Sequence, residues 1–357
     1  EPMFDTRSAI RLLAWWATGN QMPSYDLVYG HWQAELGASF SKRRWERWLH
    51  DGIVTGVPRS PSTPVFQHFD ALASAIKNGL KDAPQDELFE VNFHLDPKLA
   101  DGRYANNGWM QEVPHPMSKL CWDNAAYISP ATAKELKAEN CDLLNIQIPE
   151  VGEIQVPVWV MPGQADKTVS LNIGYGREKL GQIAEGCGVD VSKIQRGENP
   201  WFAGNAGVSK TSGQRMIYST QDHGTLDPGL GYPERPIVRE TTTTEGGWAE
   251  PDFAKQGDLM KAEDLRSLWE HNEEATLGEP KLIGKQQWGM VIDLNRCNGC
   301  NACVAACNAE NNIPIVGRKE VGNGREMHWM RIDRYEEGDA DNPTVHHQPM
   351  LCQHCDN

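Results

Sequence analysis

Six of the nine cysteines in this 357-residue chain lie at or after position 297, and their spacing is that of a metal-binding segment. Four of them form a C-x2-C-x2-C-x3-C run at Cys297, Cys300, Cys303 and Cys307. Short spacings turn successive thiolates and backbone N–H groups toward one centre, which suits an iron–sulfur cubane. The odd cysteine count disfavours a disulfide framework, and a zinc site separates its ligand pairs more widely. The run therefore predicts iron–sulfur ligation.

The run is expected to serve two [4Fe–4S] clusters. Cys297, Cys300 and Cys303 lie on one tight loop and can bind three corners of the first cluster. The longer x3 spacing is expected to place Cys307 at the start of a helix, pointing away from that loop. In two-cluster ferredoxins the fourth cysteine ligates the other cluster, and we expect the same of Cys307.

A second pair, Cys352 and Cys355, follows near the end of the sequence. Alone, a C-x2-C pair is compatible with zinc or a redox dithiol, but the complete run upstream favours half of another cluster loop. Attachment of c-type haem requires C-x-x-C-H, whereas Cys355 is followed by Asp356. We expect this chain to attach no haem of its own.

Other chemistry-bearing patterns are weaker. Residues 204–211 come within one position of a phosphate-binding P-loop, but Ser209 replaces a required glycine. Gly174-Tyr-Gly176 is a fragment of a dinucleotide fingerprint and is expected to be a turn. Three histidines and the three isolated cysteines lack metal-ligand spacing, and the isolated cysteines are expected to be small buried groups. These residues are His328, His346, His347, Cys121, Cys141 and Cys187.

Apolar periodicity predicts helices first and strands later. Helical spacing covers 10–17, 45–49 and 69–80, and tryptophans such as Trp45 and Trp48 are interpreted as core or groove-lining residues. Ser129 followed by Pro130 marks a helix start. Valine- and isoleucine-rich runs bounded by Gly and Pro predict strands at 89–95, 143–148, 154–160 and 168–173. We expect these strands to form a small barrel.

The changes in composition predict four segments. A helical segment covers 1–86, a β-barrel-like domain 87–235, an acidic linker 236–286, and a new unit 287–357. Positions 245–280 hold ten acidic and three basic residues, which indicates a solvated linker carrying one exposed helix around Leu265, Leu268 and Trp269.

Charge and hydropathy argue against nucleic-acid binding and against a membrane span. The net charge of −15 and the lack of a basic patch argue against nucleic-acid binding. The mean hydropathy is −0.57, and no uncharged apolar run approaches the ~20 residues of a membrane span. No export signal follows Glu1, so any such signal is expected to lie upstream or to have been removed.

The cysteine segment resembles a known family. Residues 292–314, together with 348–355, are similar to the four-cluster ferredoxin subunits of the DMSO and polysulfide reductase class. Asn308 stands where small bacterial ferredoxins have proline, as is usual in that class. Upstream, residues 101–112, 122–125, 129–133 and 162–166 resemble the C-terminal part of molybdopterin oxidoreductases.

The resemblance implies an α+β multidomain chain: a double-psi β-barrel of molybdopterin-oxidoreductase type, then an incomplete ferredoxin-like iron–sulfur domain. Residues 1–86 would be a helical segment of the molybdopterin-oxidoreductase-like region. This fusion is similar to the iron–sulfur subunit of alternative complex III, a bacterial quinol-oxidising respiratory complex. We therefore expect an internal portion of a longer polypeptide, with further cysteine motifs beyond it.

The resemblance also implies cofactors, partners and location. It implies [4Fe–4S] clusters, with a [3Fe–4S] cluster held by motifs beyond this chain, and no molybdopterin. The implied partners are a membrane quinol-binding subunit and c-type haem subunits. They would hold this chain, as a peripheral subunit, at the periplasmic face of the bacterial inner membrane.

Three functions remain open on the sequence. The first is an electron relay in a quinol-oxidising complex, performing no substrate chemistry itself. The second is an active molybdopterin (Mo-bisPGD) oxidoreductase with a fused electron-transfer domain. The third is a scaffold whose ferredoxin part serves assembly. Molybdenum analysis separates the first two, and redox-dependent EPR tests the third.

Overall fold

The computed structural model describes residues 6–57, 68–79, 88–179, 181–221, 223, 243–244, 247–248 and 290–352. The chain forms two compact units, Glu1–Ala71 and Leu72–Asn357. The boundaries expected near 86, 235 and 286 lie outside the described residues, as do the expected linker helix and Cys355.

The first unit is helical, with α1 (Ala9–Thr18), α2 (Ser24–Leu36) and α3 (Lys42–Asp51). Trp45 and Trp48 of α3 are buried, as predicted, and Trp45 Nε1 donates to Tyr25 Oη at 2.8 Å. Trp16 is 75% exposed and does not lie in a core. Helix α2 was not predicted, because its apolar residues form no regular stripe.

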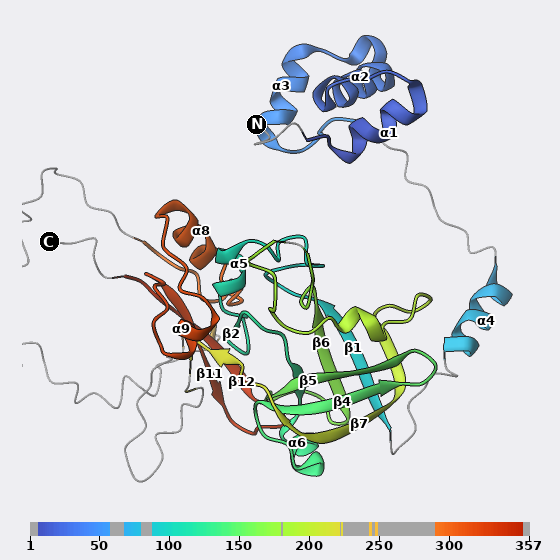
Figure 1. The fold of residues 1–357 in the computed structure, drawn as a ribbon. Helices are drawn as coiled ribbons and strands as arrows, with labels where there is room; N and C mark the ends of the chain where they lie inside the picture. Colours follow the sequence, from blue (N-terminus) through green and yellow to red (C-terminus); the bar gives the residue numbers. More distant parts are fainter. Residues whose placement is uncertain are drawn as a thin grey trace, which may run out of the picture. The chain divides into compact units, whose positions relative to one another are not determined.

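Helix α4 (Phe69–Gly79) spans the division between the two units and coincides with the predicted stripe at 69–80. A closed six-stranded barrel follows, in the order β1-β6-β3-β5-β4-β7 (Figure 1). Pairs β1·β6 and β3·β5 are parallel, and the other neighbours are antiparallel. The strands are β1 (Phe89–Leu95), β3 (Ala126–Ile128), β4 (Asp142–Ile148), β5 (Gly152–Val160), β6 (Thr168–Ile173) and β7 (Phe202–Gln214).

The barrel confirms the strand predictions. β1 and β6 have the predicted bounds, and β4 and β5 each begin one or two residues earlier than expected. Alternate residues of β4 point into the core, where Leu144, Ile146 and Ile148 are buried. Helix α6 (Pro130–Leu136) begins as predicted, since Ser129 Oγ accepts a hydrogen bond from Thr132 N at 3.0 Å.

Further short elements lie between the barrel strands or follow them along the chain. They are α5 (Gly108–Glu112), β2 (Leu120–Cys121), the 3-10 helix η3 (Val191–Ile194), β8 (Tyr218–Ser219), β9 (Thr243–Thr244) and β10 (Gly247–Trp248). Strand β2 pairs with β8, and β9 with β10.

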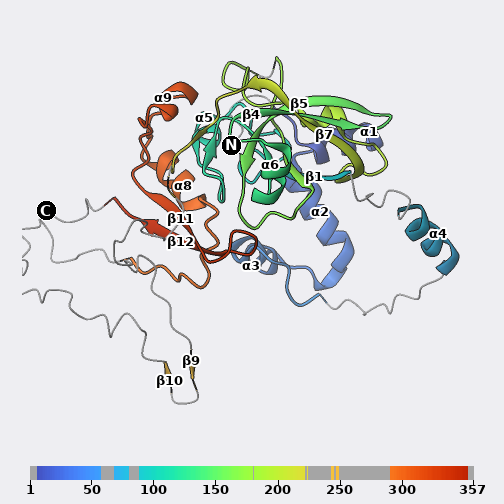
Figure 2. The ribbon, with the colours of Figure 1, turned by 90° about the horizontal axis from the view of Figure 1, so that it is seen from below.

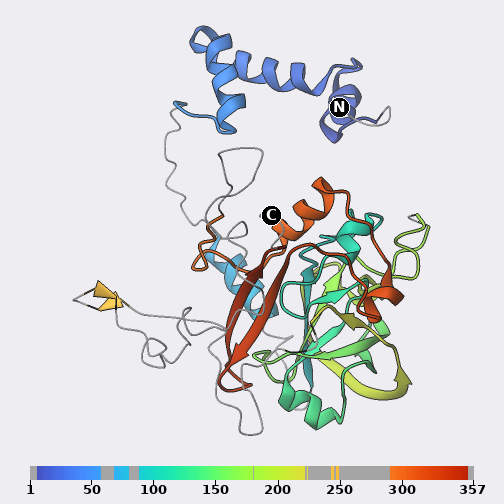
Figure 3. The ribbon, with the colours of Figure 1, turned by 90° about the vertical axis from the view of Figure 1, so that its left-hand side faces the viewer.

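The cysteine segment packs beside the barrel. It contains α8 (Ala302–Glu310), α9 (Arg318–Gly322) and a hairpin of β11 (Arg331–Glu337) and β12 (Thr344–Met350). Helix α8 lies next to α5, and the hairpin runs along the side of the barrel region (Figures 2 and 3). Gly163 N, after β5, donates to Ala340 O in the hairpin turn at 2.8 Å. Among the described helices, none is long and apolar enough to cross a bilayer.

Candidate iron–sulfur centre

The first cysteine motif begins on a tight loop. Cys297 N donates to Asp293 O at 3.1 Å, which closes a turn just before the motif. Gly299 and Asn301 have φ angles of 69° and 61°, in the left-handed region that reverses the chain. The chain therefore turns twice between Cys297 and Cys303, as the short spacings predict.

Gly299 allows this loop to lie against the hairpin. A Cβ at that position would lie 2.3 Å from Nδ1 of His347 on β12, so a side chain there would collide with the imidazole ring. Strand β12 ends at Met350, and half-buried Cys352 follows two residues later. The loop of the first motif thus contacts the strand that leads into the second. Cys355 lies outside the described residues.

Helix α8 carries two of the cysteines, so the expected helix start at Cys307 is wrong. The helix begins at Ala302, because the alanines between the last two cysteines are strong helix formers. Cys303 and Cys307 are therefore one turn apart on the same side of α8. Cys303 is exposed and Cys307 is half-buried, whereas Val304 and Asn308 are buried. The packed face of α8 is thus adjacent to the face that carries the thiols.

The donor set fits an iron–sulfur cluster. The predicted ligands are all thiols, which soft metal centres prefer, and the glycine at 299 leaves no side chain between the loop and the hairpin. Partial desolvation raises the pKa of the Cys303 thiol, so binding as a thiolate releases a proton. In the part of the chain that the structure describes, no three His, Cys, Asp or Glu side chains converge on one metal ion. Assignment of individual ligands stays a prediction.

A buried glutamate joins α5 to the chain that follows α8. The Glu112 side chain is 2% exposed, and its carboxylate accepts hydrogen bonds from Val316 N at 3.0 Å and Gly317 N at 2.8 Å. Trp122 Nε1 donates to the same carboxylate at 3.1 Å. These partners lie as much as 205 positions apart in sequence. Hydrogen bonds to a charged acceptor are the stronger kind, so this contact fixes the segment firmly.

Two further hydrogen bonds tie α8 to the barrel region. Trp109 Nε1 donates to Ile313 O at 2.6 Å, just after α8. Asn301 Nδ2 donates to Pro114 O at 2.8 Å, immediately before α8. Both ends of the cysteine-bearing helix are therefore held by the residues 109–114.

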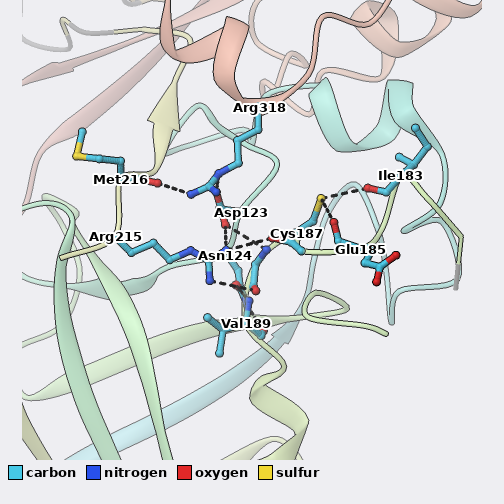
Figure 4. Close-up of polar contacts among 11 residues, drawn as sticks. Asp123, Asn124, Ile183, Glu185, Cys187, Val189, Arg215, Met216 and Arg318 are labelled. Carbon is cyan, nitrogen blue, oxygen red and sulfur yellow. Dashed lines mark hydrogen bonds and ion pairs between the residues drawn. The ribbon is translucent and has the colours of Figure 1, made fainter. Parts of the chain in front are cut away.

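A second buried carboxylate, that of Asp123, holds α9 (Figure 4). Its oxygens lie 2.7 Å from Arg215 Nη2 and 2.5 Å from Arg318 Nε, and Gly188 N donates to it at 3.1 Å. Burial raises the pKa of Asp123, and the two guanidinium groups oppose that rise. Arg318 lies in α9, so this ion pair is a second anchor for the cysteine segment.

Two of the three isolated cysteines are small buried groups, as expected. Cys187 Sγ donates to Ile183 O at 3.1 Å (Figure 4), and Cys121 Sγ donates to Glu112 O at 2.9 Å. Burial raises the pKa of Cys121 to about 12, so it stays a thiol. Cys141 is half-buried.

The near-P-loop lies in a strand. Residues 204–211 are part of β7, whereas a phosphate cradle requires a loop before a helix. Lys210 Nζ lies 2.6 Å from Asp142 Oδ2 on β4, and its hydrogen bond lowers the pKa of Asp142 to about 2. Lys210 therefore has a structural partner within the barrel.

The other weak motifs also have structural roles. Gly174 and Gly176 have φ angles of 105° and 67° in the loop after β6, as expected for a turn. His328 Nδ1 lies 3.0 Å from Asn308 Nδ2, and the remaining pair, His346 and His347, lies on β12.

The sequence did not predict that Glu112 and Asp123 anchor the cysteine segment. Their surroundings, residues 109–112 and 122–125, carried only the family resemblance. Each carboxylate follows a tryptophan at short spacing, which is a weak signal that the acidic side chain is buried and needs partners. The partners themselves are distant in sequence.

Comparison with known proteins identifies the C-terminal segment. Residues 296–357 match the family described as 4Fe-4S dicluster domain. A tetrathionate reductase subunit of Archaeoglobus fulgidus is 39% identical over 82 residues, covering 21% of this chain and 33% of the relative. The menaquinone reductase iron-sulfur cluster-binding subunit of Nitratidesulfovibrio vulgaris is 37% identical over 73 residues, covering 20% and 28%.

A third relative is an Hdr-like menaquinol oxidoreductase iron-sulfur subunit of Archaeoglobus fulgidus, 30% identical over 87 residues, covering 20% of this chain and 31% of the relative. The chain thus spans about a third or less of the length of these curated relatives. Among solved structures, acetylene hydratase from Pelobacter acetylenicus is 12% identical, with a TM-score of 0.27, covering 43% of this chain and 21% of that one. That structural similarity is too low to support an inference.

Proposed function

We propose that this chain is the iron–sulfur electron-transfer part of a membrane-associated quinol-oxidising respiratory complex of the alternative complex III type. It relays electrons from quinol toward haem subunits or a terminal acceptor. The observation that carries this proposal is the cysteine loop and helix of a dicluster domain, anchored on a barrel by two buried carboxylates. Two relatives named for menaquinone or menaquinol support a quinone-linked role.

The chain's own residues hold and orient the clusters. Bound clusters supply one-electron transfer. Cys297, Cys300 and Cys303 hold one, Cys307 holds its neighbour, and Cys352 with Cys355 contributes to the second motif. Glu112 and Asp123 keep this segment fixed against the barrel, so the distance between redox centres and partner surfaces is constant during turnover. No substrate chemistry is assigned to these residues.

The barrel has a supporting role in this proposal. Its two parallel strand pairs within a six-stranded closed barrel are compatible with the double-psi type. We assign it to a molybdopterin-type domain that binds no molybdenum. The complex then places the quinol site and c-type haems in partner subunits and holds this chain at the periplasmic face of the inner membrane.

Purification of the intact complex from membranes tests this assignment. We expect this chain to co-purify with membrane and c-type haem subunits, with iron and acid-labile sulfide present and molybdenum absent. Stoichiometric molybdenum would favour the active molybdopterin oxidoreductase instead. Recovery of the protein free in the cytoplasm, without membrane subunits, would contradict the proposed complex.

A further inference from the structure

Lys119 is a buried lysine in an unfavourable position. Its side chain is 1% exposed, and its Nζ has no hydrogen-bond partner among the described residues. Its φ is 58°, a left-handed conformation that lysine seldom adopts. The backbone is held on both sides, since Lys119 N donates to His115 O and Lys119 O accepts from Thr220 N, each at 3.0 Å. Burying an apolar side chain at this position would cost less free energy than burying an ammonium group. The presence of a lysine here therefore needs an explanation.

The side chain lies at a cavity of about 170 Å³ shared with the start of α8. Asn301, which follows Cys300 directly, and Val304 of α8 line the same cavity, as do Glu326 and His328. Asn301 Oδ1, Glu326 Oε2 and His328 Nε2 are also buried without hydrogen-bond partners among the described residues. A polar cavity of this size holds water. The ammonium group and the cysteine loop therefore border one polar chamber.

Neither acidic residue that lines the cavity, Glu326 or Asp333, is hydrogen-bonded to Lys119 Nζ. Asp333 lines the cavity but accepts from Arg331 Nε at 2.9 Å. Burial and the nearby Arg334 together lower the pKa of Lys119 to about 8, against the opposing effect of Asp333, Cys121 and Cys297. Below that pKa the ammonium form is favoured, and Lys119 lies at the cavity that Asn301 of the cysteine segment also lines.

We propose that Lys119 sets the reduction potential of the cluster assigned to Cys297, Cys300 and Cys303, by presenting a buried positive charge to it from the barrel region. A cluster with its thiolates is negatively charged, and reduction adds one more negative charge. A nearby ammonium group in a low-dielectric site stabilises the reduced form more than the oxidised form. This inference rests on the proposed function, since it requires that loop to bind a cluster.

The test is an EPR-monitored redox titration of the intact complex carrying Lys119→Met or Lys119→Gln. Both variants remove the charge, and the glutamine keeps a polar end in the cavity. We expect the equilibrium constant for one-electron reduction to fall by about tenfold, a shift of about 59 mV to more negative potential. The shifted signal should be the one that Cys300→Ala removes. Lys210→Met, which removes a lysine paired within the barrel, should cause no shift.

The outcomes separate this inference from the function on which it depends. Clusters present at wild-type potential in both Lys119 variants would overturn the inference and leave the relay intact. An equal shift in Lys210→Met would also overturn it, because the effect would not be local. Absence of any cluster signal from the wild-type complex would contradict the proposed function and the inference together.

Discussion

Replacing Cys300 by alanine should remove or convert one cluster while the barrel stays folded. The side chain is exposed, so no core cavity forms. The iron content should fall by about four atoms if the cluster is lost, or by about one if it becomes a [3Fe–4S] cluster. Chemical iron analysis and EPR spin quantitation measure this, and quinol-driven electron flow should slow accordingly.

Two further cysteine variants test whether the lost EPR signal belongs to the cluster that Cys300 is predicted to bind. Cys307→Ala should alter a different EPR signal, because Cys307 is predicted to ligate the neighbouring cluster. Cys187→Ala, which changes a buried thiol beside Ile183, should affect mainly stability. Loss of the same signal in both Cys300→Ala and Cys307→Ala, with the other signal intact, would refute the split ligation.

Glu112→Ala should destabilise the contact between the barrel and the cysteine segment. The change leaves three N–H donors, those of Val316, Gly317 and Trp122, without their acceptor in a buried site. At ~1–3 kcal/mol for each unsatisfied buried donor, we expect unfolding to become easier by about 3 kcal/mol or more. Denaturant unfolding measures the loss, and amide hydrogen exchange should accelerate around residues 313–318.

The matched control for this variant is Glu139→Ala. Glu139 is an acidic residue on the exposed surface of the barrel region, so its truncation should change the unfolding free energy by less than about 0.5 kcal/mol. Equal stability of the Glu112 and Glu139 variants would show that the buried carboxylate does not anchor the segment.

Strands whose pattern of apolar and polar residues reflects their burial could be predicted from the local sequence. In β1 buried residues alternate with half-buried ones, most of β6 is buried, and the bounds of both strands were predicted. β7 was missed because its Gly, Ala, Asn and Ser residues have low strand propensity. Its place in the barrel comes from pairing with β1 and β4, which no local pattern encodes.

In the candidate site, too, local features could be predicted from the sequence and contacts between distant residues could not. The spacing of the cysteines is itself the chemical signal, so the sequence can predict them as ligands, and their assignment stays a prediction. The anchors could not, since Glu112 and Val316 are 204 positions apart and meet only in the folded chain. The helix start at Ala302 was missed because the spacing of ligands does not determine where the helical hydrogen bonds begin.

Anaerobic reduction of the intact complex by quinol, followed by rapid freezing and EPR, tests the relay most directly. The account predicts that cluster signals appear within a turnover, decay when the acceptor is added, and appear more slowly in Cys300→Ala. Clusters that dithionite reduces but quinol never does would contradict it.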